Sequence, residues 1–349
     1  MVINKVGIAG YGIIGERRHK YIDDNPQLQT IAVCDQKFDN DTILESGVKC
    51  YSNYQNLLDE PIDILFICLP NYLAPEVTIA GLERGMHIFC EKPPGRNVLD
   101  VENVFQVKQK YPKLYLKYGF NHRYHDSVKD ALEIVRSGKL GKVVNIRGIY
   151  GKSIISPFNK TWRSKRKYAG GGILLDQGIH IVDLMQLFCD EFIEVKSFVS
   201  NSFWKCDVED NVYAIMRSKS GVVGTLHSSA TQWQHRFSLE IGLEEGYLGL
   251  YGILTGTRSY GEERLIIGKR KGYESLTGTD REEIITYLVD HSWSDEINEL
   301  VEMIVSGGNS QSGSVEDALK TMKLVYQIYW ADTTWRDTRN IQNPNSQTH

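Results

Sequence analysis

A glycine-rich turn near the start of the chain constrains the fold more than any other feature. Gly10, Gly12 and Gly15 follow an apolar run at residues 5–9 and fit the pattern Gly-x-Gly-x-x-Gly. In such a strand–turn–helix unit, the first glycine makes the tight turn, the second lets a pyrophosphate approach the backbone, and the third lets the helix pack on the strand. The helix N-terminus then faces the phosphates. The turn therefore predicts a dinucleotide site, although glycine-rich turns also occur in methyltransferases and without a ligand.

A carboxylate at the expected spacing favours NAD as the dinucleotide. A second apolar run at residues 30–34 ends in Asp35, which follows Gly15 by about 20 residues, the spacing at which a carboxylate reaches the adenosine ribose. Such a carboxylate accepts the ribose hydroxyls of NAD and repels the 2′-phosphate of NADP. Lys37 weakens this argument because it stands close by in the sequence. We predict NAD as the cofactor, with NADP less favoured.

The first 120 residues alternate apolar runs with helical patterns, which predicts a parallel sheet wound with helices. Strands are expected near residues 2–9, 29–35, 63–69, 86–90 and 114–120, and helices near 13–24, 73–84 and 97–110. Two strands end in polar segments, and the carboxyl ends of parallel strands form the edge where ligands bind. The predicted cofactor contacts are Gly10, Tyr11, Gly12, Ile13, Ile14, Gly15, Asp35, Pro70, Asn71, Glu91 and Lys92.

After residue 121 the pattern changes to long strands with few crossover helices. Strands are expected near 142–150, 194–203, 211–218, 222–230, 235–243, 246–253 and 262–268, and helices near 126–137, 293–305 and 314–334. This pattern predicts an α+β domain with a large, open, mainly antiparallel sheet. We place a Rossmann domain at 1–121, an α+β substrate-binding and oligomerisation domain at 122–335, and a polar tail at 336–349. The open face could bind a second copy, so we expect a homodimer or homotetramer.

Composition excludes several classes of function. The net charge of −4 argues against nucleic acid as the main partner, and no apolar run approaches the ~20 residues that span a bilayer. The six cysteines are dispersed and form no Cys/His cluster, so no metal site is indicated. The first residues enter a strand directly, without a charged segment followed by an apolar one. We expect a cytoplasmic protein that acts on a small molecule.

The most informative segment of the second half is the stretch at residues 170–185, where a glycine turn opens a helix that is apolar nearly all round. Asp176 and His180 stand four residues apart within it, hence on one helix face. Gly178 between them costs about 1 kcal/mol relative to alanine, which indicates that another group approaches closely. Ionisable groups in a buried helix need a task or a partner. Asp176 and His180 could be a catalytic pair or a structural pair whose members bond to each other, and the sequence leaves both interpretations open.

These segments together resemble the Gfo/Idh/MocA family of NAD(P)-dependent sugar and inositol oxidoreductases. The shared motifs are the glycine turn, Pro70-Asn71, Glu91-Lys92-Pro93, Trp162-Arg163 and the helix at residues 170–184, and the match runs from residue 2 to about residue 335. The resemblance implies a Rossmann domain, an α/β domain with an open sheet, and a lysine, an aspartate and a histidine in the chemistry. By position these are Lys92, Asp176 and His180. The sequence departs from many members at Tyr72-Leu73-Ala74-Pro75, where they carry a histidine.

The residue types suit oxidation of a secondary alcohol, which needs a base for the hydroxyl proton. His180 is the candidate base because histidine titrates near neutral pH, Lys92 can stabilise negative charge on the oxygen, and Asp176 can orient the histidine or bind a hydroxyl. The predicted substrate-binding residues are Asn121, Arg123, Tyr124, Trp162, Arg163, Lys165, Arg166, Asp176 and His180.

A basic segment between Gly151 and Gly170 bears on the choice of substrate. It holds Lys152, Lys160, Arg163, Lys165, Arg166 and Lys167 and no acidic residue. Because arginine and lysine bind phosphate oxygens, we expect a nucleotide-diphosphate sugar of a polysaccharide-building pathway. A solvated basic loop is the plainer reading. An inositol or free-sugar dehydrogenase is the alternative enzyme, and a non-catalytic NAD(P)-binding regulatory protein is the alternative of another class.

Overall fold

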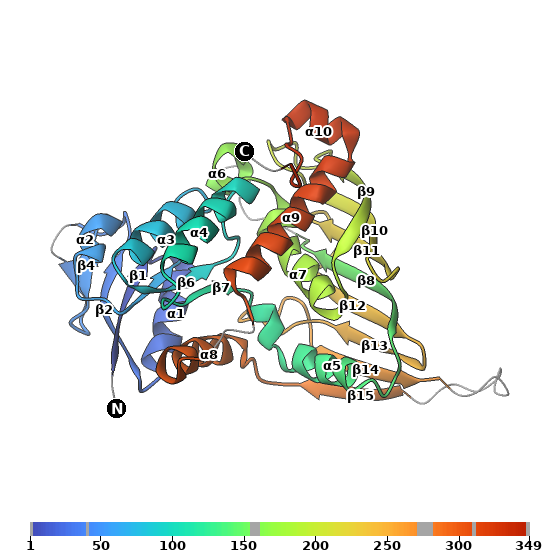
Figure 1. The fold of residues 1–349 in the computed structure, drawn as a ribbon, viewed down its shortest axis with the longest axis horizontal. Helices are drawn as coiled ribbons and strands as arrows, with labels where there is room; N and C mark the ends of the chain where they lie inside the picture. Colours follow the sequence, from blue (N-terminus) through green and yellow to red (C-terminus); the bar gives the residue numbers. More distant parts are fainter. Residues whose placement is uncertain (1–2, 40–41, 154–160, 271–281, 309–311, 347–349) are drawn as a thin grey trace. The chain divides into compact units, whose positions relative to one another are not determined.

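The computed structural model describes residues 3–39, 42–153, 161–270, 282–308 and 312–346, and the chain forms two compact units (Figure 1). The first unit comprises Met1–Asn121, Lys167–Gly170 and Trp293–Met322. The second comprises His122–Arg166, Gly171–Ser292 and Lys323–His349. The segment at 293–322, which the sequence-based boundaries place in the second domain, thus belongs with the first unit. The reason is that α8 completes the core of that unit, as described below.

The first unit contains a sheet of seven strands in the order β3-β4-β2-β1-β5-β6-β7 within the described residues. The paired strands run parallel except for β3 and β4. This is the predicted wound parallel sheet, and the sequence missed only the short strands at its edge. The strands are β1 (Asn4–Ala9), β2 (Leu28–Cys34), β3 (Thr42–Ile43), β4 (Lys49–Tyr51), β5 (Ile64–Ile67), β6 (His87–Glu91) and β7 (Leu116–Gly119).

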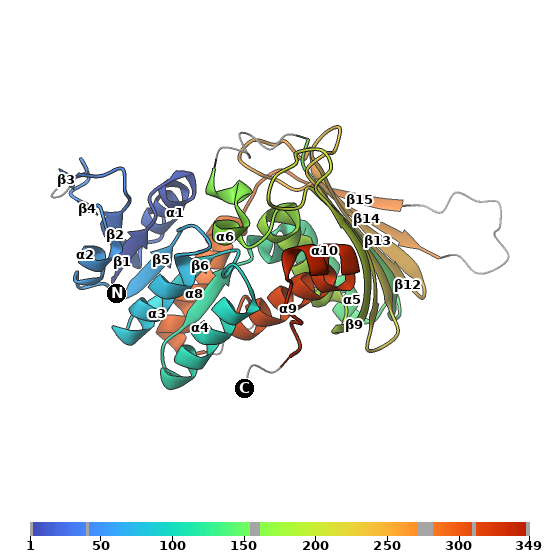
Figure 2. The ribbon, with the colours of Figure 1, turned by 90° about the horizontal axis from the view of Figure 1, so that it is seen from above.

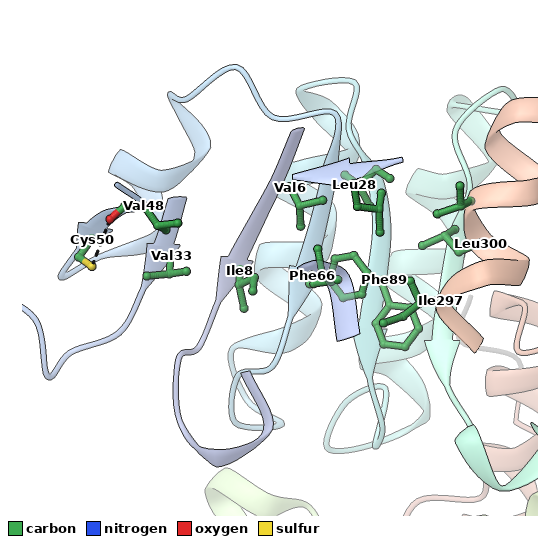
Figure 3. Close-up of a cluster of buried hydrophobic side chains, with 13 residues drawn as sticks. Val6, Ile8, Leu28, Val33, Val48, Cys50, Phe66, Phe89, Ile297 and Leu300 are labelled. Carbon is green, nitrogen blue, oxygen red and sulfur yellow. Dashed lines mark hydrogen bonds between the residues drawn. The ribbon is translucent and has the colours of Figure 1, made fainter. Parts of the chain in front are cut away.

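Helices cover both faces of this sheet because successive side chains of each strand point to opposite faces. A side chain at Gly81 in α3 would meet Leu65 and Ile88 on one face. On the other face, Figure 3 shows Ile297 and Leu300 of α8 beside Phe89, in a core that also includes Ile8. The helices of this unit are α1 (Ile13–Asp23), α2 (Tyr54–Leu58), α3 (Ala74–Glu83), α4 (Val98–Lys110), α8 (Ser292–Ser306) and the start of α9 (Val315–Ala331).

The second unit contains an eight-stranded sheet in the order β15-β14-β13-β12-β8-β11-β10-β9, counted over the described part of the chain. Among the strand pairs that the structure describes, β8 and β11 alone run parallel, which confirms a mainly antiparallel sheet. The strands are β8 (Val143–Gly151), β9 (Phe192–Ser200), β10 (Asn211–Ser218), β11 (Val223–Ser229), β12 (Arg236–Leu243), β13 (Gly246–Tyr251), β14 (Glu263–Lys269) and β15 (Glu282–Tyr287). β15 was not predicted from the sequence.

One face of this sheet carries the helices of the unit, and the other face is bare in the described residues (Figure 2). In β10, Val212, Ala214 and Met216 are buried, whereas Tyr213 and Ile215 point outward and are more than half exposed. The helices and shorter turns of this unit are α5 (Asp126–Ser137), the π-helical turn η4 (Leu174–Gly178), α7 (Ile179–Phe188), the end of α9, α10 (Thr333–Arg339) and the 3-10 turns η1 (Asn121–Tyr124) and η3 (Trp162–Ser164). The short helix α6 (Arg166–Ala169) lies mostly in the first unit.

The end of the chain is more ordered than a polar tail. Asp332 caps the N-terminus of α10, where its carboxylate accepts the backbone N–H of Trp335 at 2.9 Å, and Asn340 caps the C-terminus. Trp335 and Ile341 are both buried. These apolar side chains hold the segment after Arg336 against the rest of its unit, and polar composition alone did not reveal them.

Among the described residues, the helices are too short or too polar to cross a bilayer.

Candidate active site

The glycine turn has the geometry that its three positions require. Gly10 adopts φ +91°, and a Cβ atom there would lie 2.5 Å from the Cys68 carbonyl oxygen. A side chain at Gly15 would collide with the Gly10 carbonyl, whereas a Cβ atom at Gly12 would meet nothing within 4 Å. The first and third glycines are therefore needed for close packing. The second leaves open space at the start of α1, where a pyrophosphate would approach.

Asp35 follows β2 and is tied to the same turn. Its Oδ2 accepts the backbone N–H of Tyr11 at 2.9 Å, and its Oδ1 accepts that of Lys37 at 3.1 Å. The Lys37 ammonium lies 2.6 Å from Oε1 of Glu16, so its charge is already paired. The cation that weakened the argument for NAD is thus engaged by a carboxylate. The fixed position of Asp35 beside Tyr11 suits a contact with the ribose.

The polar residues after β5 and β6 have partners within the first unit. Asn71 is buried, and its Nδ2 donates to the Ala169 carbonyl at 2.7 Å. Glu91, the last residue of β6, accepts a hydrogen bond from Arg18 Nε at 2.7 Å. Both side chains therefore hold the protein itself together. Their contacts with the cofactor, like those of Pro70 and Lys92, stay predictions.

A buried ionic cluster holds the end of β6 where Lys92 follows. Arg18 is fully buried, and its Nη2 lies 2.6 Å from Glu91 Oε1 and 2.7 Å from Glu296 Oε2. The guanidinium also lies 4.3 Å from the ring centroid of Phe89 and 4.2 Å from that of Trp293. Burial raises the pKa of Glu296 to about 7, against the opposing effect of Arg18. One arginine thus joins α1, β6 and α8.

In the second unit, the segment that carries Asp176 is a π-helical turn rather than the predicted regular helix. η4 spans Leu174–Gly178 and passes directly into α7. A side chain at Gly178 would collide with Ser228 of β11, which explains the glycine that the sequence flagged. Glu209 accepts the backbone N–H groups of Gly172 at 2.7 Å and Leu174 at 3.0 Å, which fixes the entry to the turn. Such π-turns are frequent at functional sites.

His180 is buried in a cluster of rings. Its ring stacks on that of His122, with centroids 3.7 Å apart and planes 13° apart. Tyr150 of β8 lies 6.3 Å from His180 and 5.6 Å from His122, measured between ring centroids. Burial raises the pKa of Tyr150, so its hydroxyl stays protonated at neutral pH. That hydroxyl donates to Gln177 Oε1 at 3.4 Å.

Asp176 lies among polar groups beside this cluster. Its Oδ2 accepts a hydrogen bond from Gln177 Nε2 at 3.0 Å, and its Oδ1 lies 3.6 Å from Arg163 Nε. The Arg163 guanidinium stacks 4.5 Å from the ring centroid of Trp162. Asp176 and Arg163 are both partly exposed, with 23% and 46% of their side-chain surfaces accessible. The second unit thus brings Asp176, Arg163 and Trp162 together, and their contacts with a substrate stay predictions.

Other predicted substrate contacts are engaged elsewhere in the second unit. Arg123 Nε donates to Asp183 Oδ2 at 2.7 Å, in a buried ion pair between η1 and α7. Tyr124 is buried in the core, and Asn121 is only partly buried. Drawing the Arg123 guanidinium away from Asp183 would leave an uncompensated buried charge. Arg123 is a poor candidate for direct substrate binding.

The basic segment does not form one anion site in its described part. Arg166 donates to the Arg339 carbonyl and, through its backbone, to Asp207. Lys165 is exposed, and Lys167 belongs to the first unit, where it lies 5.6 Å from the ring centroid of Tyr168. Lys160 lies outside the described residues. Because Arg163 and Arg166 have separate partners, they do not form the joint basic cluster that favoured a nucleotide-diphosphate sugar as the substrate.

Sequence reasoning missed His122, Tyr150 and Gln177 as members of this site. His122 stands between two residues that were predicted to bind substrate, and Gln177 stands next to Asp176, so proximity in sequence was the available signal. Tyr150 ends a predicted strand and offered none. In the described part of the chain, no three His, Cys, Asp or Glu residues are arranged to hold a metal ion.

Comparisons with known proteins identify both halves of the chain. Residues 4–119 match the profile described as the oxidoreductase family, NAD-binding Rossmann fold, and residues 128–249 match the GFO/IDH/MocA C-terminal domain. Levoglucosan dehydrogenase of Pseudarthrobacter phenanthrenivorans is 27% identical over 234 residues, which cover 59% of this chain and 57% of that protein. The match thus spans less than two thirds of that relative. Myo-inositol 2-dehydrogenase of Thermotoga maritima is 28% identical over 238 residues, covering 66% and 68% of the two chains.

Solved structures share the fold over a longer range. Levoglucosan dehydrogenase in complex with NADH and L-sorbose has a TM-score of 0.82 at 20% identity, covering 96% of this chain and 98% of that one. Myo-inositol 2-dehydrogenase from Lactobacillus plantarum has a TM-score of 0.77 at 22% identity, covering 95% and 98%. At this identity the likeness establishes the fold.

Proposed function

Because this chain belongs to the Gfo/Idh/MocA family of oxidoreductases, we propose that it is an NAD-dependent dehydrogenase of a free sugar or an inositol. It transfers hydride between the nicotinamide and a secondary hydroxyl or keto carbon. The observation that carries the proposal is His180, buried at the start of α7 directly after the turn that holds Asp176. A buried histidine beside a polar turn is a suitable general base.

The residues of the first unit fit NAD. Gly12 leaves open space at the N-terminus of α1, and Asp35 presents a fixed carboxylate for the ribose. A dinucleotide lies with its pyrophosphate at such a helix N-terminus and its ribose at such an acid. When bound, NAD supplies the hydride acceptor. The contacts that we assign to it are those at Gly10–Gly15, Asp35, Pro70–Asn71 and Glu91–Lys92.

The chain's own residues transfer the hydroxyl proton and stabilise the negative charge that develops in the reaction. His180 accepts the proton of the hydroxyl that is oxidised and returns it in the reverse direction. Lys92, by its match to the family's lysine, is assigned to stabilise negative charge that develops in the reaction, and Asp176 with Arg163 is assigned to bind hydroxyls of the substrate. Trp162 offers an aromatic face to the apolar side of a sugar ring.

A free polyol fits these observations better than a nucleotide sugar. The proteins matched by sequence are named for levoglucosan, D-glucosides, anhydrofructose and inositol, which carry no diphosphate. Of the basic residues expected to bind a diphosphate, Arg163 lies beside Asp176, and Arg166 contacts the Arg339 carbonyl and Asp207. The nucleotide-sugar reading and a role in polysaccharide synthesis therefore give way to the free-sugar and inositol alternative.

A substrate panel tests the proposal. Purified protein is mixed with NAD and with inositols, free sugars, sugar glycosides and nucleotide sugars, and NADH formation is followed by absorbance. We expect turnover of one or more uncharged polyols, and turnover lowered by about 10²-fold or more in His180→Ala. Turnover of nucleotide sugars alone would favour the hypothesis that the substrate is a nucleotide-diphosphate sugar. Binding of NADH without turnover of any member of a broad panel would favour a regulatory protein.

We also propose that the bare sheet face of the second unit pairs copies of this chain into a dimer or tetramer. Phe198 and Ile215 project from β9 and β10 with 80% and 59% exposure. Exposed apolar side chains clustered on a sheet are typical of an interface. We expect light scattering to give an oligomer, and Ile215→Glu to weaken it while Leu99→Glu, on α4, does not. A monomeric wild type would contradict the assignment.

A further inference from the structure

Three buried histidines connect the start of α7 to the strand β14. The His122 ring lies between the other two, 3.7 Å from that of His180 and 5.4 Å from that of His125. His125 Nδ1 lies 2.7 Å from Oε2 of Glu263. All four side chains are more than nine-tenths buried. His122 therefore has a tightly defined position on the face of His180.

The far end of this row is anchored by a carboxylate. Glu263 accepts the backbone N–H of Ser127 at 3.2 Å and that of Leu254 at 3.0 Å, in addition to His125. Burial raises the pKa of Glu263, but these hydrogen bonds outweigh it and leave the pKa below its usual value. Glu263 is thus an anion at neutral pH. It fixes His125, against which the edge of His122 packs.

The flat contact between His122 and His180 has a consequence for proton transfer. A base that accepts a proton inside the protein becomes a buried cation, which is costly without compensation. The face of an aromatic ring attracts a cation, and this attraction is larger when both are shielded from water. The ionisable groups near the pair include Tyr150, which stays neutral, and Asp176 on the preceding turn. They also include Arg123 and Asp183, which form a buried ion pair between η1 and α7. Phe237, at 5.9 Å from His122, adds only an apolar ring.

We propose that His122 is a positioning residue for His180, whose ring plane it fixes and whose protonated form it stabilises through its aromatic face. The inference rests on the proposed function, because it assigns His122 a part in the proton transfer that His180 performs. His122 acts through its flat aromatic ring. The ring nitrogens of His122 take no proton from the substrate. Phenylalanine at this position should therefore replace it, whereas an aliphatic side chain should not.

The test compares His122→Phe with His122→Leu, which have similar bulk but differ in the aromatic face. His87→Leu is the matched control, since His87, the first residue of β6 in the first unit, likewise stacks on an aromatic ring, that of Tyr115. The pH profile of kcat/KM is measured with the best polyol from the panel. We expect His122→Leu to lower the pKa of the acidic limb by about one unit and kcat about tenfold. His122→Phe and His87→Leu should keep the wild-type profile.

A second readout does not depend on turnover. The titration of His180 is followed by NMR of the ¹³C-labelled ring in the protein without substrate, and its signal is assigned by its loss in His180→Gln. We expect the His180 pKa to fall in His122→Leu and to be retained in His122→Phe. If His122→Leu does not fold, His122→Met takes its place.

Two outcomes would overturn the inference. One is an unchanged His180 titration and pH profile in a folded aliphatic variant. The other is a phenylalanine variant that behaves like the leucine variant, which would show that the ring nitrogens act. If the panel reveals no substrate, the NMR titration still decides the effect of His122 on His180, and only the proposed function fails.

Discussion

Lys92 and His180 are placed by different kinds of contact. In the first unit, the strand end that precedes Lys92 is held by Arg18, a buried cation shared between Glu91 and Glu296. In the second unit, His180 is held by the flat face of His122 and by an apolar helix. Charge fixes one region and ring packing fixes the other.

The difference lies in what happens when one partner is removed. A buried ion pair that loses one member leaves an uncompensated charge, which costs more than the pair itself contributed. A ring stack that loses one ring leaves a space and a less constrained neighbour, at smaller cost. Substitutions in the Arg18 cluster should therefore reduce stability. Substitutions around His180 should mainly change activity.

The removal of Arg18 should have the largest effect on stability. We expect Arg18→Met to lower the free energy of unfolding by about 3–5 kcal/mol, because Glu91 and Glu296 would stay buried without their cation. Urea denaturation followed by tryptophan fluorescence measures it. Lys20→Met, on the exposed side of the same helix, should change stability by less than about 0.5 kcal/mol. An Arg18→Met protein as stable as the control would show that the cluster is not a stability element.

The pH dependence of stability tests the same buried ionic cluster through Glu296. Burial raises the pKa of Glu296 from 4.5 to about 7, so the folded state binds its proton more tightly than the unfolded state. Stability from this group is fully present below pH 4.5 and is lost as the pH rises toward 7, by at most about 3 kcal/mol. Glu296→Gln should remove this part of the pH dependence and exposed Glu302→Gln should not. A constant stability difference between wild type and Glu296→Gln from pH 4.5 to 7 would contradict it.

Activity is the corresponding readout for the proposed chemistry. We expect Lys92→Ala and His180→Ala each to lower turnover by about 10²-fold or more while NADH binding is retained, because a charge stabiliser or a base is lost. Turnover and NADH fluorescence are measured on the same preparations, with exposed His291→Ala as the control. Wild-type turnover in a folded His180→Ala protein would remove this residue from the mechanism.

The smallest expected effect concerns cofactor choice. We expect Asp35→Ala to weaken NAD binding about tenfold and to affect NADP less, since the lost carboxylate serves the ribose hydroxyls of NAD alone. Titration of both cofactors measures the ratio, with exposed Asp39→Ala as the comparison. Tighter binding of NADP than NAD by the wild type would refute the assignment of Asp35.

Features that depend on local backbone geometry could be predicted from the sequence. The turn at Gly10–Gly15 needs glycine for reasons confined to a few residues, and its spacing to Asp35 follows from one strand–helix–strand unit. The bounds of α5 were predicted as observed because Gly138 ends the helix with φ +68°. Regular periodicity and a single breaker residue were sufficient there.

Features that depend on contacts between residues far apart in the sequence could not be predicted from it. The π-helical turn packs against Ser228 and is held at its entry by Glu209, and both residues lie in other parts of the chain. The stack of His122 on His180 joins η1 to α7, and several elements, among them α5 and β8, lie between these two in the sequence. The contact of Arg163 with Asp176 and that of Arg166 with the Arg339 carbonyl could not be predicted, because a count of basic residues says nothing about their partners.

The return of α8 to the first unit has a consequence for biosynthesis. Arg18, Phe89 and Glu91 leave the ribosome early, but Glu296 and Ile297 follow only after about 200 further residues. At the usual rate of translation this takes on the order of ten to forty seconds. Through that interval the nascent sheet exposes the apolar surface that α8 later covers, and Arg18 lacks one of its two carboxylates. A chain stopped before residue 292 would keep that surface open, which makes it a natural client for chaperones.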